Sequence, residues 1–394
     1  MSDLSYFVRK IFDYDDFVLD SIKKVYDDKI FDVLYSLTRP SSRLYLRVNL
    51  LRSSVNDVVR EIREEGYEVF RDELLEEAVY FRVEGPNKVD GSGLRVVVDK
   101  RAAESVLMGS NLYAPGVVYC ERSIEKGSSV SIYSENNILL ADGEALISCE
   151  EALRIRRGIF VKVYKSLFKA PPIRDLRVWE RGLVYPQSLP SMIVSRLLDP
   201  MPGEVIVDMC AAPGGKTSHI YELSRGEAVI YAFDHSKKRI EEMISNLRRL
   251  GHDKINIIHG DSRYISIDHP YIKADKILLD PPCTSTGVRP KIYDHKTGDE
   301  LRSLVKYQEQ FIREAHRILR KGGVLVYSTC SITYDENEGL IKKFLDEKLF
   351  EEADPEKIFR EIYRIGERGA DDIGVRFSPL KDLPGHYVIV LIKR

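Results

Sequence analysis

The first part of the chain alternates between helical and extended patterns of apolar positions. Within about the first 40 residues, the apolar residues that recur at helical spacing are Phe7, Ile11, Phe12, Val18, Ile22 and Val25. A strand pattern covers 44–50, and Ser54 with Asp57 forms a capping box that opens a helix, which Gly66 ends. The strand carries a basic residue, Arg47, which we expect to be exposed. This unit is compatible with a small RNA-recognition module and equally with a purely structural subdomain.

The next part of the chain changes to short strands separated by turns. Strands are expected at 94–98, 130–133, 138–141 and 145–148, with a helix over 102–108. Asp142-Gly143 is typical of a two-residue hairpin turn, which would join the last two of these strands. The pattern predicts a small β-rich barrel or sandwich.

The last half of the chain alternates strands with helices. The expected strands are 205–207, 229–233, 255–258, 277–279 and 324–327, and the expected helices are 217–224, 237–250 and 301–319. This alternation predicts an α/β, doubly wound, mostly parallel Rossmann-like sheet. A final strand at 387–392 is expected to enter antiparallel, at or near an edge. We therefore predict domains over 1–92, 93–170 and 171–394, with 171–198 as a linking segment.

The charge of the chain is balanced overall but uneven locally. The 394 residues carry a net charge of −2, so no global basic excess announces a nucleic-acid partner. Between Arg154 and Arg181, however, nine basic residues face only two acidic ones, with Tyr164, Phe168 and Trp179 among them. Such a segment can neutralise phosphates and stack on bases, although it can also be a solvated face whose aromatic residues are core.

The cysteines and the apolar runs bear on the compartment. The five cysteines are far apart and form no CxxC pair: Cys120, Cys149, Cys210, Cys283 and Cys330. They suit a reducing compartment better than a disulfide framework or a zinc site. The N-terminus lacks a signal-peptide pattern, and no apolar run approaches membrane-spanning length. We expect a soluble, cytoplasmic monomer that needs no metal.

Four aspartates follow successive predicted strands and indicate the cofactor. Asp208, Asp234, Asp261 and Asp280 stand at or just past the carboxyl ends of the strands, where open α/β sheets bind ligands. The loop 208–217 resembles the end of a P-loop, but Cys210 falls where that motif needs its first glycine. Four carboxylates would also repel a triphosphate. They suit the sulfonium, ammonium and ribose hydroxyls of S-adenosylmethionine.

The expected contacts of this cofactor follow from its groups. Asp234 lies twenty residues beyond Gly214, near the spacing at which an acid meets ribose hydroxyls, and Asp261 is assigned to the adenine edge. The backbone around Gly214 should face the methionine moiety. The expected cofactor-binding residues are Cys210, Ala211, Ala212, Pro213, Gly214, Gly215, Lys216, Asp234, Arg239, Asp261 and Asp280.

Two cysteines close distinctive phrases at the same predicted sheet edge. Cys283 ends Asp280-Pro281-Pro282-Cys283, and Cys330 lies in Ser328-Thr329-Cys330-Ser331, each directly after a buried strand. Two thiols at one edge indicate covalent chemistry, with one as the attacking group and the other in support. The residues alone do not rank them.

Together with the loop 208–217, these phrases resemble the Sun-domain family of RNA cytosine-5 methyltransferases. The Arg47-Val48-Asn49 strand is similar to that family's N-terminal RNA-recognition module. The phrases 99–109, 114–117 and 141–145 resemble a PUA domain, a fold that binds RNA. A PUA-like insertion points to the subgroup that acts on the tRNA acceptor end. The family's usual aspartate-glycine-two-aromatic ending is replaced by Pro384-Gly385-His386-Tyr387, which puts detail on the last strand in doubt.

The resemblance implies a mechanism and a set of catalytic residues. Carbon 5 of cytosine is a poor nucleophile until a thiolate adds to carbon 6. Cys330 is implied as that nucleophile, Cys283 as the thiol that assists product release, and Asp280 and Lys216 as neighbours of the target base. Two other classes stay open: an amino methyltransferase acting on a base nitrogen, and an RNA-binding assembly factor with a methyltransferase-like domain.

Overall fold

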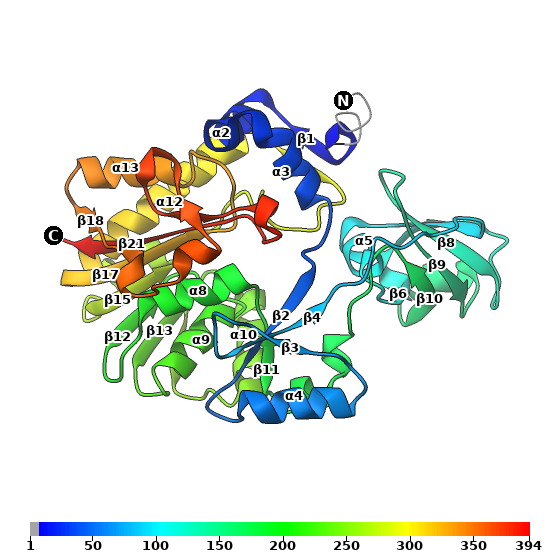
Figure 1. The fold of residues 1–394 in the computed structure, drawn as a ribbon, viewed down its shortest axis with the longest axis horizontal. Helices are drawn as coiled ribbons and strands as arrows, with labels where there is room; N and C mark the ends of the chain where they lie inside the picture. Colours follow the sequence, from blue (N-terminus) through cyan, green and yellow to red (C-terminus); the bar gives the residue numbers. More distant parts are fainter. Residues whose placement is uncertain (1–7) are drawn as a thin grey trace.

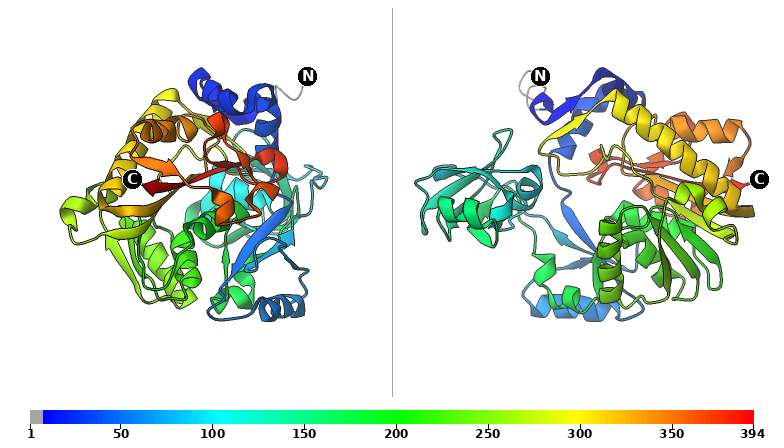
Figure 2. Two further views of the ribbon diagram at one scale, coloured as in Figure 1. Left: turned by 60° about the vertical axis from the view of Figure 1, so that its left-hand side comes forward. Right: turned by 180° about the vertical axis from the view of Figure 1, so that it is seen from behind.

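The computed structural model describes residues 8–394 as a large C-terminal domain, an N-terminal region beside it, and a small β-rich domain set apart (Figure 1). Strands β2 (Arg43–Val48) and β4 (Ala78–Arg82) run between the large domain and the small one (Figure 1). Figure 2 shows the same arrangement from two further sides. Within residues 8–394, no helix is both long enough and apolar enough to cross a bilayer.

The C-terminal domain is built on a nine-stranded sheet. Its strands are β12 (Val205–Asp208), β13 (Val229–Asp234), β14 (Ile255–His259), β15 (Ala274–Leu279), β17 (Leu319–Thr329), β18 (Phe350–Glu352), β19 (Glu367–Arg368), β20 (Val375–Phe377) and β21 (His386–Lys393). They lie in the order β14-β13-β12-β15-β17-β21-β20-β19, with β18 paired to β21. The five neighbouring strands β14, β13, β12, β15 and β17 are parallel to one another, which confirms the predicted fold class.

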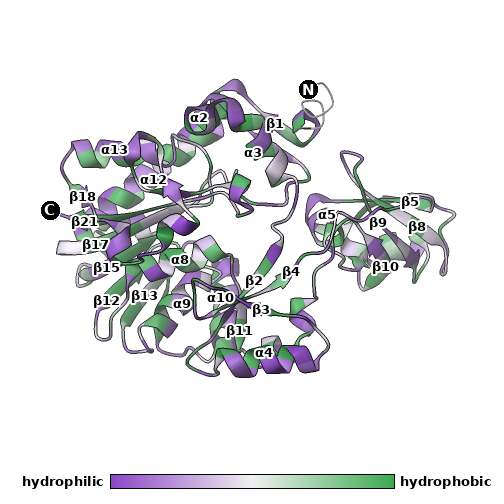
Figure 3. Ribbon diagram, in the orientation of Figure 1, coloured by the Kyte–Doolittle hydropathy of each residue, from purple (hydrophilic) through white to green (hydrophobic). Residues whose placement is uncertain are grey.

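Helices cover both faces of this sheet. They are α8 (Leu189–Leu198), α9 (Gly215–Leu223), α10 (Lys237–Leu250), α11 (Ile265–Asp268), α12 (Gly298–Ile318) and α13 (Glu338–Asp346). One core contains residues of α8, α9 and α10, and the other contains residues of α12 and α13. The strands between them are apolar on both sides, as a doubly covered parallel sheet requires, and Figure 3 shows β12 and β13 as hydrophobic.

The last strand lies near an edge of the sheet but not at it. β21 is antiparallel to β17, as predicted, and β20 and β18 pair along its other side. The sequence analysis did not find these two strands, which have only three residues each. Such short segments leave almost no periodic signal in the sequence.

The N-terminal region contains helices and a four-stranded sheet. Its elements are β1 (Phe12–Tyr14), α2 (Asp16–Tyr26), α3 (Ile30–Leu37), β2 (Arg43–Val48), α4 (Val55–Glu64), β3 (Phe70–Arg71) and β4 (Ala78–Arg82). The sheet is completed by β11 (Val184–Pro186), which comes from the segment expected to be a linker and is preceded by α7 (Arg177–Glu180). Ser54 caps α4 through the backbone N–H of Asp57, as the sequence predicts.

The prediction for the first residues was wrong in part. Phe12 is not helical, because β1 pairs in parallel with β16 (Asp294–Lys296), a contact across almost the whole chain. Phe7 lies outside the described residues. Helix α2 packs near α12, so the N-terminal helices belong to the surface of the large domain.

Arg47 is fully buried, which overturns the expectation of an exposed basic residue. Its guanidinium donates to both carboxylate oxygens of Glu222 at 2.9 Å, to Ser218 Oγ at 2.7 Å and to the carbonyl oxygen of Gly215 at 2.7 Å. It also donates to Gln187. No local pattern around Arg47 indicates this burial, because its partners come from α9 and from the residues just before α8, far along the chain. Arg47 thus ties the N-terminal sheet to α9.

The β-rich domain forms one six-stranded sheet with two helices. Its elements are β5 (Leu94–Val98), α5 (Lys100–Leu107), β6 (Leu112–Tyr113), β7 (Val117–Cys120), β8 (Ser129–Ser134), β9 (Leu139–Ala145), α6 (Cys149–Ile155) and β10 (Ile159–Ser166). The strand order is β6-β10-β9-β8-β5-β7. Its core contains residues of every one of these elements.

The predicted hairpin at Asp142-Gly143 was wrong, because both residues lie inside β9. The Asp142 carboxylate is buried and accepts from the Ser131 hydroxyl and the backbone N–H of Asp90. At Gly143, a Cβ atom would lie 2.4 Å from Val161 of the neighbouring strand β10. The pair is therefore needed for a buried acceptor and a close strand approach, while its residue types mimic a turn.

Two cysteines of this domain form a disulfide, contrary to the expectation from sequence. Cys120 ends β7, Cys149 begins α6, and their Cα atoms are 5.9 Å apart. Their separation of 29 positions along the sequence hides this proximity, because only the folding of β8 and β9 brings the two ends together. Cys210, Cys283 and Cys330 remain free thiols.

Candidate active site at the carboxyl edge of the sheet

The four predicted aspartates do meet along one edge of the sheet. Asp208 and Asp234 end β12 and β13, Asp261 follows β14, and Asp280 follows β15. These four strands are neighbours in the sheet. Parallel strands place their carboxyl ends together, so a crevice forms there at the point where the strand order reverses.

The edge is less negative than the sequence indicated, because three of its acids have a cationic partner. Lys216 Nζ lies 2.6 Å from Asp280, an Arg239 guanidinium nitrogen lies 3.3 Å from Asp234, and the Arg263 guanidinium forms a fork on Asp261. Burial raises the pKa of Asp208, which has no such partner, to about 7. The argument from four bare carboxylates therefore overstated the negative charge of the site.

The loop between β12 and α9 wraps around this crevice. Gly214 caps α9 with φ at +98°, a left-handed conformation that favours glycine. The Thr217 hydroxyl donates to Asp208 at 2.7 Å and anchors the first turn of α9 under the loop. Lys216 therefore leaves the helix start and reaches across to Asp280, instead of pointing to a phosphate as a P-loop lysine would.

Two hollows along the edge fit the expected cofactor. One is narrow and lined by Asp234 and Asp261, and the other encloses about 250 Å³ beside Lys216 and Asp280. Cys210 lines both hollows, so they meet at the loop. Carboxylates line both hollows, and they suit a ligand with ribose hydroxyls and a cationic amino-acid end.

Several of the expected cofactor-binding groups already contact one another. The Asp234 carboxylate accepts from the backbone N–H of Ala212 at 3.2 Å and from that of Ser236 at 2.9 Å. Arg239 bridges Asp234 and the carbonyl oxygen of Ala212. A ribose that binds Asp234 must therefore displace or share the Arg239 contact. Among residues 8–394, no group of three His, Cys, Asp or Glu side chains is placed to hold a metal ion.

The thiols of Cys283 and Cys330 lie 3.3 Å apart, as the two phrases predict. Cys283 follows the end of β15, and Cys330 follows the end of β17. The Asp280 carboxylate links them to the rest of the edge, because it accepts from Lys216 and from Ser328 Oγ at 2.9 Å. All four residues expected to be catalytic therefore lie close together at this edge of the sheet.

The surroundings make the two thiols unequal. The hydrogen bond from Cys283 lowers the pKa of Cys330, helped by Ser285 and Lys216 and opposed by burial. The same hydrogen bond, with burial, raises the pKa of Cys283 well above its ordinary value. The surroundings thus favour the thiolate at Cys330 over the thiolate at Cys283.

The positively charged lysine stays charged next to these thiols. Burial alone would lower the pKa of Lys216, but Asp280 raises it above its ordinary value. Burial alone would likewise raise the pKa of Asp280, but Lys216 lowers it. The pair is therefore an ammonium and a carboxylate, able to donate to and accept from a base edge.

Sequence reasoning missed several residues that shape the site. Ser285 lies 3.4 Å from Cys330 Sγ and has φ at +55°, so it stands at a sharp turn that has no sequence signature. Tyr185 and Gln187 line the larger hollow from the segment expected to be a linker. The Ser328 contact could have been expected, because Ser328 precedes Cys330 by two residues on a buried strand.

The basic segment is only partly free to contact a ligand. Arg177 and Arg181 face Glu65 and Glu61, and Lys165 faces Asp90. Phe168 is in the core of the β-rich domain, as the alternative interpretation of this segment held. The remaining basic residues that are exposed are Arg154, Arg156, Arg157, Lys162, Lys169 and Arg174. Tyr164, 64% exposed, stands among them.

Comparison with known proteins gives two family matches. Residues 195–387 match the family described as 16S rRNA methyltransferase RsmB/F, and residues 94–167 match the PUA domain. The first match covers the sheet edge with the loop and both thiols. The second covers the β-rich domain.

Individual relatives match over nearly the whole chain. A tRNA (cytosine(72)-C(5))-methyltransferase of Pyrococcus horikoshii is 39% identical over 366 residues, 92% of each chain. The human tRNA (cytosine(72)-C(5))-methyltransferase NSUN6 is 28% identical over 92% of this chain and 83% of its own. The crystal structure of NSun6 from Pyrococcus horikoshii with SFG superposes with a TM-score of 0.90 at 38% identity, covering 96% of this chain and 98% of that one.

Proposed function

This chain belongs to the RsmB/F family of methyltransferases, in a group that also carries a PUA domain, and we propose that it methylates carbon 5 of cytidine 72 at the acceptor end of tRNA. It is an S-adenosylmethionine-dependent RNA cytosine-5 methyltransferase. The observation that supports the chemistry best is the pair of unequal thiols, 3.3 Å apart, beside the Lys216–Asp280 pair.

We assign the attack to Cys330. Its thiolate forms a bond to carbon 6 of the cytosine, and the electron pair displaced from the C5–C6 double bond makes carbon 5 nucleophilic. S-adenosylmethionine supplies the methyl group as an electrophile on a positively charged sulfur. Lys216 and Asp280 face the polar edge of the base, where they stabilise the charge that develops around nitrogen 3.

We assign product release to Cys283. After methylation, the proton on carbon 5 must leave so that the electron pair can re-form the double bond and expel the Cys330 thiolate. The hydrogen bond to Cys330 is the largest cause of the raised pKa of Cys283. Once the Cys330 sulfur is bonded to carbon 6, this cause disappears and the pKa of Cys283 falls, so Cys283 can lose its own proton to solvent and, as a thiolate, take the proton from carbon 5. The second thiol is therefore inactive in attack and active in release.

The PUA domain and the exposed basic residues beside it are the proposed contact with the acceptor arm. Arg154, Arg157, Lys162 and Lys169 are exposed and can neutralise phosphates, and Tyr164 can stack on a base. A single copy carries both the PUA domain and the complete thiol pair, so we propose that a monomer acts on one tRNA.

The test is methylation of defined transcripts with labelled S-adenosylmethionine, followed by bisulfite sequencing. The expected product is 5-methylcytidine at position 72 of a tRNA transcript with C72, and none in the matched transcript with U72. Methylation of another tRNA cytidine would overturn the assigned position. Absence of 5-methylcytidine, with the methyl group on a base nitrogen, would overturn the proposed chemistry.

A further inference from the structure

Two adjacent buried residues hold the loops that carry the two thiols. Glu336 and Asn337 stand just before α13, and both are 0% exposed. Although they are neighbours in sequence, most contacts of the Glu336 side chain are with the Cys283 loop, with one to Thr333 of the Cys330 loop, and those of the Asn337 side chain are with the Cys330 loop. Neither touches Cys283 or Cys330 directly.

The Glu336 side chain crosses to the loop of Cys283. One carboxylate oxygen accepts from the backbone N–H of Thr284 at 2.8 Å and from Gln308 Nε2 at 2.9 Å. The other accepts from the hydroxyls of Thr284 at 2.5 Å and of Thr333 at 2.9 Å. Gln308 Nε2 also donates to the carbonyl oxygen of Pro282 at 2.9 Å. The residues on both sides of Cys283 are therefore fixed through Glu336.

The Asn337 side chain instead closes the loop of Cys330 on itself. Its carbonyl oxygen accepts from the Thr329 hydroxyl at 2.6 Å. Its Nδ2 donates to the carbonyl oxygens of Ser331 at 3.1 Å and Thr333 at 2.7 Å. The residues on both sides of Cys330 thus depend on Asn337, which uses its one acceptor and both donors.

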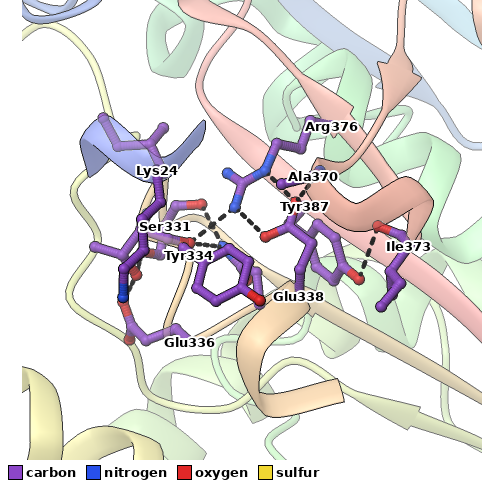
Figure 4. Close-up of polar contacts among 12 residues, drawn as sticks. Lys24, Ser331, Tyr334, Glu336, Glu338, Ala370, Ile373, Arg376 and Tyr387 are labelled. Carbon is purple, nitrogen blue, oxygen red and sulfur yellow. Dashed lines mark hydrogen bonds and ion pairs between the residues drawn. The ribbon is translucent and has the colours of Figure 1, made fainter. Parts of the chain in front are cut away.

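The loop of Cys330 has further support that does not involve Glu336. Arg376, paired with Glu338 at 2.5 Å, donates to the carbonyl oxygen of Thr333 at 2.8 Å (Figure 4). The backbone N–H of Tyr334 donates to Ser21 of α2. Removal of Glu336 therefore takes away the Thr284 and Gln308 contacts beside Cys283, while the Cys330 loop loses only the Thr333 hydroxyl contact and keeps its backbone contacts with Asn337, Arg376 and Ser21.

The electrostatic effect of Glu336 acts in the same direction as its contacts. After the hydrogen bond to Cys330, burial and the charge of Cys330, the Glu336 carboxylate is a further cause that raises the pKa of Cys283. It therefore helps to keep Cys283 protonated while Cys330 attacks.

We propose that Glu336 is the positioning residue for Cys283 and that Asn337 is the positioning residue for Cys330, so that adjacent side chains separately control product release and attack. This inference rests on the proposed function, because it assigns residues to two steps of that reaction. It predicts opposite phenotypes for two neighbouring substitutions.

The experiment measures the covalent protein–RNA adduct on a denaturing gel, with the full chain, a labelled C72 tRNA transcript and S-adenosylmethionine. Glu336→Ala should accumulate adduct while turnover falls by about 100-fold, because a displaced Cys283 fails in release. Asn337→Asp, of nearly equal size, should give little adduct. Its carboxylate would face two carbonyl oxygens and displace the attacking Cys330.

Glu336→Gln is the matched control. An amide of the same shape can accept from Thr284 N–H and Gln308, and it can donate to the two threonine hydroxyls, which are free to rotate. It should keep turnover within about tenfold of the unsubstituted enzyme, without excess adduct. A purely structural role for Glu336 would lower thermal stability and adduct formation together in Glu336→Ala.

The Cys283→Ala variant separates the two possible failures. If Cys283→Ala gives no adduct, the assigned roles of the thiols are wrong. If Cys283→Ala accumulates adduct and Glu336→Ala does not, the positioning role of Glu336 is wrong. If Asn337→Asp accumulates adduct, the positioning role of Asn337 is wrong. Should Glu336→Ala not fold, Thr284→Val is the second variant, which keeps the backbone N–H contact with Glu336 and loses the hydroxyl contacts with Glu336, Thr286 and Ser331. It must accumulate adduct, though less than Cys283→Ala, or the role of Glu336 is refuted.

Discussion

Arg47 offers the sharpest test of how the N-terminal region supports the cofactor loop. Arg47→Met removes the guanidinium and keeps most of the side-chain length. It leaves Glu222 buried without its partner, and it removes the donors to Ser218 and to the Gly215 carbonyl at the start of α9. Both side chains of the pair are almost fully buried, at 0% and 4% exposure, so water cannot replace the lost contacts.

The loss should be large and dependent on pH. Removing one partner of a buried ion pair costs about 3–5 kcal/mol, and at roughly 2–4 °C per kcal/mol for a domain of this size the apparent Tm should fall by about 6–20 °C. Burial raises the pKa of Glu222 to about 7 even with Arg47 present. Without Arg47 the pKa rises further, so the stability defect should be largest above pH 8 and shrink as Glu222 takes up its proton at lower pH.

The assay is thermal unfolding by circular dichroism, combined with S-adenosylmethionine binding by calorimetry. A double variant, Arg47→Met with Glu222→Met, should recover most of the lost stability, because it removes the unpaired charge. It should not recover cofactor affinity, because the start of α9 still lacks its anchor. An unchanged Tm in Arg47→Met, or a double variant less stable than the single one, would refute the reasoning.

Three further predictions concern the site itself. Cys330→Ala should abolish methylation and the adduct while calorimetry still detects S-adenosylmethionine binding, and Cys283→Ala should accumulate adduct on a denaturing gel; the reverse pattern would exchange their roles. Gly214→Asp strains a left-handed turn that has no room for a side chain. This substitution and Asp234→Ala should each weaken S-adenosylmethionine binding at least about tenfold. Unchanged affinity would contradict the assigned pocket. Burial raises the pKa of Asp208 in the folded protein to about 7. The protonated carboxyl therefore favours the folded state fully below its ordinary pKa, and this contribution is lost as pH rises through 7. In urea unfolding of the cofactor-free protein, the free energy of unfolding of Asp208→Asn should rise relative to that of the unsubstituted protein between about pH 5 and 8, and a constant difference would show that this carboxyl is already ionised.

Much of the fold could be predicted because its signals are local. Helix α10 spans the residues that its periodicity indicated, with Ser236 as N-cap and Gly251 after its end. The parallel strands read as short apolar runs because both of their faces are covered. The position of both thiols at one edge followed from strand direction alone, without any knowledge of distance.

The errors share one physical cause, which is that the partners of a residue lie far away in sequence. Arg47 has the residue type of a surface contact, but its partners on α9 make it a buried anchor. Asp142-Gly143 has the residue types of a turn, but Ser131 and Val161 on neighbouring strands require them inside β9. Cys120 and Cys149 look unrelated until the strands between them fold back.

The sequence by itself determined which chemical groups reach the carboxyl edge of the sheet, because strand direction and motif spacing are local properties of the chain. Only the tertiary structure decided how those groups differ. The pKa values of Cys330 and Cys283 move apart chiefly because the two thiols, from separate strands, hydrogen-bond to each other, with smaller contributions from Ser285 and Lys216 to Cys330 and from burial and Glu336 to Cys283. Ionisation depends on distances through space, and the order of residues along the chain does not contain those distances.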